Sequence, residues 1–204
     1  MRKLKAADQK LLMDLAQAAV EAAVRRGPVP VPEPETLTPA LMAPAALFVT
    51  IRESGELRGC IGMMRFETPL WENVLEAAAA AALHDPRFRP IEQSELPALV
   101  LEVSVLEPLM ALPDPAGFVA GRHGIVVERD GRRALLLPQV AAEMGWAAEE
   151  MLDAVCRKAN LPGDAWRDRT TRLHVFEATS YSANVSAATA AESDECRSQG
   201  SAPR

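Results

Sequence analysis

Apolar residues near the start of the chain recur at helical spacing. Between residues 8 and 26 they fall three or four positions apart, with charged residues elsewhere on the helical wheel, which predicts an amphipathic helix. Gly27 and Pro28 end this helix. The segment 28–44 is rich in proline, which removes backbone donors and disfavours helix, so we expect an extended linker there.

From residue 46 the hydrophobic period changes to two. Segments 47–52 and 56–62 alternate between apolar and polar positions and predict two strands of a hairpin. Pro69 begins a predicted helix, and residues 98–106 alternate again as a strand. This part of the chain is therefore expected to form a hairpin, a helix and a third strand.

A similar order of elements follows in residues 120–180. Two alternating segments flank the tight turn at 129–131, Pro138 begins a helical region, and residues 172–179 predict a final strand. The repeated order indicates an internal duplication, with a first half at about 45–110 and the second at about 120–180.

The composition is typical of a folded protein, with 49% hydrophobic and 25% charged residues among 204. We expect one domain over residues 1–182 and a disordered polar tail at 183–204. The net charge of -6 argues against nucleic acid as a partner. The absence of a long apolar run argues against a membrane as a partner. Abundant alanine, proline and arginine suggest a GC-rich bacterial genome.

The three cysteines show no disulfide or zinc spacing. They fit the reducing environment of the cytoplasm, so we predict a cytoplasmic protein without a metal site. The chain also lacks the glycine-rich phosphate loop and the dinucleotide-binding fingerprint. We therefore expect no tightly bound cofactor.

The segment Leu57–Gly62 is the most unusual in chemical terms. Strand alternation would place Arg58 and Cys60 on one face, where the guanidinium favours the thiolate form of the cysteine. Gly59 and Gly62 weaken a strand and suggest that a ligand or another backbone approaches closely. The alternative is an inert cysteine buried in a glycine-kinked core strand, which the spacing alone favours.

Four further residues are candidates for the site. Asp85 and Arg87 follow the second predicted helix and can bind an acidic ligand or pin the loop to itself. His123 lies between glycines and can act as a base or as a hydrogen-bonding turn residue. Glu143 lies on a predicted helix and can reach a cleft or remain an exposed carboxylate.

The hexapeptide Leu57–Gly62 resembles the signature of the AMMECR domain family. Five other segments occur in the matching order: 84–88, 102–106, 121–125, 137–146 and 157–161. The resemblance extends over about residues 8–180. It implies an α+β fold in which two duplicated strand-helix units share one curved, mainly antiparallel sheet with flanking helices and an N-terminal helix. It also places Arg58, Gly59, Cys60 and Gly62 in the presumed functional region.

Bacterial and archaeal members resemble protein A of the AmmeMemoRadiSam system. This implies an accessory or substrate-handling component that acts on an unknown small-molecule substrate, together with a Memo-like protein and a radical S-adenosylmethionine protein. One alternative is a cysteine-dependent enzyme with Cys60 as nucleophile, Arg58 lowering the thiol pKa, and His123 or Glu143 as proton acceptor. A second alternative is a protein-interaction module.

Overall fold

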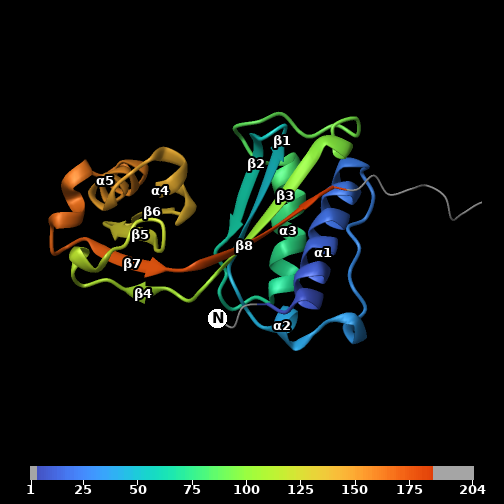
Figure 1. Cartoon of the computed structure of the whole chain (residues 1–204), viewed down its shortest axis with the longest axis horizontal. Coiled ribbons are helices and arrows are strands. Elements are labelled where there is room, and N and C mark those ends of the chain that lie inside the picture. Colours follow the sequence, from blue (N-terminus) through green and yellow to red (C-terminus); the bar gives the residue numbers. More distant parts are fainter. Residues whose placement is uncertain (1–3, 186–204) are drawn as a thin grey trace, which may run out of the picture.

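Residues 4–185, described here by a computed structural model, form an α+β fold with two four-stranded antiparallel sheets (Figure 1). The elements in chain order are α1 Ala6–Val24, η1 Pro34–Thr36, α2 Pro39–Met42, β1 Leu47–Glu53, β2 Glu56–Met63, α3 Leu70–Leu83, η2 Leu96–Ala98, β3 Leu99–Leu106, β4 Met110–Ala111, η3 Pro115–Gly117, β5 Gly124–Arg129, β6 Arg132–Leu136, α4 Gln139–Met144, α5 Ala148–Lys158, η4 Gly163–Arg167, β7 Arg172–Phe176 and β8 Ala178–Asn184. The α+β class and the N-terminal helix expected from the sequence are confirmed.

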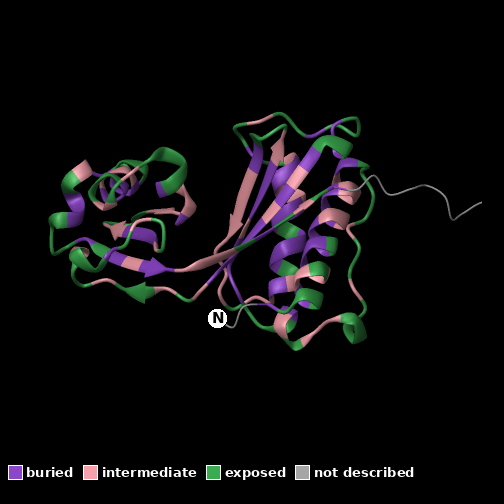
Figure 2. Ribbon diagram, viewed as in Figure 1, coloured by how far each residue is buried: buried purple, intermediate pink, exposed green. Residues whose placement is uncertain are grey.

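The first sheet has the strand order β2-β1-β3-β8, and helices α1 and α3 cover one of its faces (Figure 1). Alternation along β1 sends Val49 and Ile51 toward these helices, and both are fully buried. Leu101 and Val103 of β3 pair with them and join the same core. The helices show their buried stripes where they face the sheet (Figure 2).

The second sheet has the order β4-β7-β5-β6, with α5 packed against β5 and β6. Ile125 and Val127 of β5 form a second core with Met151 and Val155 of α5. In both sheets the first hairpin strand is central, since β1 lies between β2 and β3 as β5 lies between β6 and β7. The two halves thus repeat one topology, as duplicated units should.

Two chain segments run from one sheet to the other. β3 leads into β4, which pairs with β7, and β7 leads into β8, which pairs with β3. Between these pairs the two segments are joined by a hydrogen bond from Glu107 N to Glu177 O at 2.8 Å. Pro108 follows Glu107 and cannot donate a ladder hydrogen bond. The one shared sheet expected from the sequence is consequently divided into two.

The linker and the C-terminal boundary differ from expectation. Residues 28–44 include the short helices η1 and α2, and Leu41 of α2 is fully buried. The expected tail from residue 183 begins too early, because Ala183 and Asn184 belong to β8 and Val185 N donates to Leu99 O at 2.9 Å. The remainder of that predicted tail, 186–204, lies outside the described residues. Within residues 4–185, no helix is both long and apolar enough to cross a membrane.

Candidate functional site

A row of polar side chains crosses the face of the first sheet that α1 and α3 leave uncovered. The strand register pairs Cys60 with Thr50, and Thr50 with Glu102. The Thr50 hydroxyl donates to Cys60 Sγ at 3.4 Å. The second half of the chain lies on this side of the sheet (Figure 1). The row is therefore between the two halves.

Helix α4 connects the second half to this face. Gln139 Nε2 donates to Glu102 Oε1 at 3.3 Å and to Ser104 Oγ at 3.2 Å. Glu143, further along the helix, accepts a 3.0 Å hydrogen bond from Arg52 Nη2 on β1. Glu143 thus forms a half-exposed ion pair between the halves. Within residues 4–185 the carboxylate of Glu143 pairs with Arg52 and makes no hydrogen bond or ion pair with Cys60.

Asp85 fastens the loop after α3 to β2. Its carboxylate is almost fully buried and accepts from Cys60 N at 2.8 Å and from Arg87 Nη2 and Nε at 2.7 and 2.9 Å. Arg87 Nη2 also donates to Cys60 O at 3.3 Å. The hydrogen bond with Asp85 raises the pKa of Arg87, and the Cys60 group acts in the same direction. Asp85 therefore holds an exposed guanidinium beside the cysteine.

Lys158 of α5 completes this cluster from the second half. Its ammonium donates to Leu135 O of β6 at 3.0 Å. Although the side chain keeps much of its surface in solvent, desolvation by the surrounding protein atoms lowers the pKa of Lys158. Cys60 opposes this effect, and the positive charge of Arg87 adds to it. Lys158 therefore lies within electrostatic range of Cys60 and Arg87. Sequence reasoning missed Lys158, although it is the only lysine after Lys10 in an arginine-rich chain.

The predicted pairing of Arg58 with Cys60 is wrong in its geometry. Ile51 pairs with Gly59 whereas Arg52 pairs with Leu57, so Arg58 is the extra residue of a β-bulge and the strict alternation fails there. The buried Arg58 guanidinium instead forms an ion pair with Glu95, at 2.8 Å from Nε to Oε1.

Arg58 makes further hydrogen bonds to the same loop. Its Nη1 donates to Arg89 O at 2.7 Å and its Nη2 to Pro90 O at 3.2 Å. Arg58 also lowers the pKa of Glu95, against the opposing effect of burial. The cation beside the thiol is therefore Arg87, and Arg58 holds residues 89–95 against β2.

Close packing explains why glycine occupies positions 59 and 62 of the hexapeptide. A Cβ on Gly59 would lie 2.3 Å from the carbonyl oxygen of Ala81, so α3 packs directly against the strand backbone. A Cβ on Gly62 would lie 2.2 Å from the ring of Phe48. These contacts show that another part of the chain approaches the strand closely, which is one of the two explanations expected for these glycines. Ligand binding by Gly59 and Gly62 stays a prediction.

His123 is held by its own loop. Its Nδ1 accepts a 3.2 Å hydrogen bond from Val119 N, and its ring packs 6.2 Å from that of Phe118. In the described part of the chain, His123 makes no hydrogen bond or ring contact with Cys60 or the polar row. Among residues 4–185, no group of three or more His, Cys, Asp or Glu side chains could hold a metal ion. Near Cys60, the cations Arg87 and Lys158 can bind an anionic group next to the thiol.

Acid should weaken the fold through Asp85. The hydrogen bond from Arg87 lowers the pKa of Asp85 from 3.8 to about 2, although burial opposes the shift. Because the folded pKa is below the unfolded value, this stability is fully present above pH 4 and is lost as the pH falls toward 2. In urea unfolding, the advantage of the wild type over Asp85→Asn should shrink by about 2 kcal/mol between pH 6 and pH 2. An advantage that does not vary with pH would contradict the shifted pKa.

Comparison with known proteins agrees with this architecture. The family model AMMECR1 matches residues 13–181. A protein of Pyrobaculum islandicum is 43% identical over 179 residues, covering 82% of this chain and 79% of the relative. One from Methanothermobacter thermautotrophicus is 41% identical over 175 residues, covering 83% and 91%. The crystal structure of the uncharacterized protein PH0010 from Pyrococcus horikoshii superposes with a TM-score of 0.83 at 37% identity, covering 88% of this chain and 93% of that one. The chain therefore belongs to the AMMECR1 family.

Proposed function

We propose that this protein is a cytoplasmic substrate-handling component that holds an anionic small molecule beside Cys60. The observation that carries the proposal is the Arg87 guanidinium held against Cys60, with Lys158 of the second half within electrostatic range of both. Asp85 orients Arg87 through two side-chain hydrogen bonds, so little conformational freedom is left to lose on binding. A guanidinium and an ammonium together favour a carboxylate or phosphate group.

The proposed partners are a Memo-like protein and a radical S-adenosylmethionine protein. Family resemblance supports them. In this scheme the present chain binds the substrate and the partners supply the metal-dependent or radical chemistry. Co-purification of tagged protein with such partners from its own cells tests their association. An untargeted comparison of metabolites between wild-type cells and cells with Cys60→Ser tests whether Cys60 takes part.

The second candidate function is a cysteine-dependent enzyme. Two contacts favour it, since Thr50 donates to the Cys60 sulfur and Arg87 lies at the same residue. A nucleophilic cysteine also needs a proton acceptor within hydrogen-bond reach. His123 and Glu143, the acceptors expected from the sequence, hydrogen-bond Val119 and Arg52 instead. The binding role is therefore the better supported of the two.

An alkylation experiment separates an anion-attracting cysteine from an inert one. The measured quantity is the ratio of the alkylation rate with iodoacetate to the rate with neutral iodoacetamide. We expect this ratio to be higher for Cys60 than for glutathione under the same conditions. Replacing Lys158 with methionine should lower this iodoacetate preference about three- to tenfold, because roughly 1 kcal/mol of attraction at a solvated site is lost. Mass spectrometry after proteolysis measures the rate at each cysteine.

Two controls accompany this experiment. Lys10→Met removes an exposed lysine that pairs with Asp14 on α1, away from the polar row, and should leave the preference unchanged. Cys156 is fully buried and should remain unlabelled while the protein is folded. Labelling of Cys60 only on unfolding, or an equal preference in Lys158→Met and wild type, would refute the proposed anion site.

A further inference from the structure

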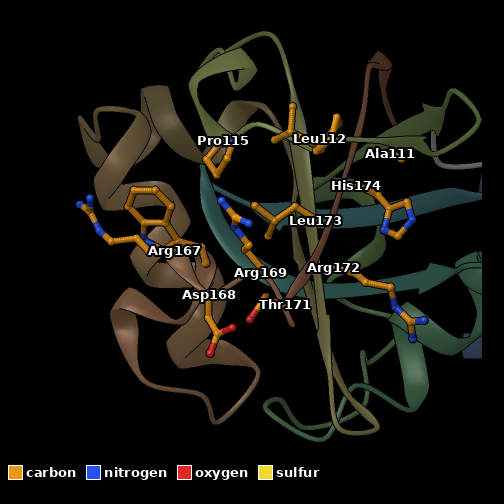
Figure 3. Close-up of a pocket in the computed structure, with 12 residues that line it drawn as sticks. Ala111, Leu112, Pro115, Arg167, Asp168, Arg169, Thr171, Arg172, Leu173 and His174 are labelled. Carbon is orange, nitrogen blue, oxygen red and sulfur yellow. The ribbon is translucent and has the colours of Figure 1, made fainter.

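A separate cavity of about 680 Å³ lies in the second half of the chain (Figure 3). It is bounded by the end of β4, the segment leading into η3, the end of η4 and the first residues of β7. This volume is within the range of small-molecule sites. The cavity shares no lining residue with the polar row around Cys60.

Three arginines line this cavity, and two of them have acidic partners. Arg167 pairs with Glu149 at 3.0 Å and stacks over Trp166, 4.0 Å from the ring centroid. Arg172 pairs with Glu128 at 2.5 Å. Figure 3 shows both of these side chains extending outward on opposite sides. Their charges are thus largely neutralised on the protein itself.

Arg169 is the exception. Within residues 4–185 its guanidinium has no hydrogen bond or ion pair, and it lies in the middle of the lining residues, near Leu173 (Figure 3). The one lining carboxylate, Asp168, is already used by Arg129 at 3.1 Å and by Thr170. A positive charge without a counter-ion therefore faces the cavity.

The backbone around Arg169 is fixed by its neighbours. Thr170 N and Oγ1 both donate to Asp168 Oδ1 at 2.9 Å, and Thr171 Oγ1 donates to Ala165 O at 2.7 Å. These bonds hold the segment on both sides of the arginine. Apolar walls come from Leu112, Pro113, Pro115 and Leu173. The cavity thus combines one uncompensated cation with surfaces suited to a hydrocarbon group.

We propose that this cavity binds a small organic anion, with Arg169 holding its carboxylate or phosphate group. The guanidinium fork matches either oxyanion with two parallel hydrogen bonds. The apolar part of the ligand packs against the prolines and leucines of the walls. His174, at the β7 end of the cavity, offers a ring nitrogen to a second polar group of the ligand.

The test uses three probes of similar shape: benzoate, phenyl phosphate and the neutral benzyl alcohol. Amide NMR titrations of the full chain should show shifts at residues 167–174 with both anions and much weaker shifts with the alcohol. Comparing the two anions decides between a carboxylate and a phosphate. Arg169→Met should weaken anion binding at these residues about tenfold, as expected for loss of a charge-assisted pair.

Arg133→Met is the matched control, because Arg133 is also exposed and lies outside the cavity, on β6. It should leave the affinity unchanged, which separates a local effect from a change in net charge. Shifts confined to Gly59–Ile61 would support the Cys60 site and refute this one. Absence of shifts at 167–174, or equal affinity of Arg169→Met and wild type, would also overturn the proposal.

Discussion

Replacing Arg58 with methionine is expected to lower the free energy of unfolding by about 3–5 kcal/mol, since it leaves the buried Glu95 carboxylate without its cation. The carbonyls of Arg89 and Pro90 lose their donors as well. Urea denaturation followed by circular dichroism measures the loss. Strand alternation had placed this guanidinium beside the Cys60 thiol, whereas its ion pair with Glu95 makes the stability of the fold the property that should change.

The control for Arg58 is the same substitution at Arg52. This arginine pairs with Glu143 at the surface, so Arg52→Met should cost less than about 1 kcal/mol. The double variant Arg58→Met/Glu95→Met removes the orphaned charge and should recover part of the stability. If Arg58→Met is as stable as Arg52→Met, the buried pair does not have the role assigned to it.

Replacing Gly59 with alanine is expected to cost about 3 kcal/mol through overpacking. The new methyl group would lie 2.3 Å from the Ala81 carbonyl oxygen and 3.2 Å from its carbon. Both atoms belong to the backbone of α3, so no side-chain rotation relieves the contact and the helix has to move away from β2. The midpoint of urea unfolding reports this change.

Gly27→Ala provides the comparison for Gly59. Its added methyl group meets only Ala22 O, at the ordinary contact distance of 3.8 Å. We expect the stability to change by less than about 1 kcal/mol in either direction. Equal stabilities of the two variants would show that α3 can shift from β2 at little cost.

Local patterns in the sequence determined most of the helices and strands of this protein. The helical spacing of residues 8–26 predicts α1, and the alternation in 47–52 and 56–62 predicts the β1–β2 hairpin, because both periods reflect which side chains one element can bury. Prolines at 69 and 138 mark helix starts for a similarly local reason. The repeated hairpin, helix and strand could therefore be identified without any knowledge of the contacts between halves.

The tertiary structure decided how the two halves are joined. Only the single residue Glu177 separates β7 from β8, and the sequence reads as one strand across it. The hydrogen-bonding partners of the two parts belong to different sheets. Alternation shows which side chains share a face, but it contains no information on which distant strand lies beside them.

The surroundings of Cys60 were decided in the same way. A single bulged residue at Arg58 changes the direction of its side chain, so the guanidinium reaches Glu95 and the neighbouring carbonyls. Arg87 takes the place beside the thiol because Asp85 binds both it and the Cys60 amide. Lys158 belongs to α5, in the other half of the chain. The sequence by itself determined most of the helices and strands and the family. Long-range packing determined which charged groups lie near the cysteine, because electrostatic partners depend on distance in space, which local periodicity does not specify.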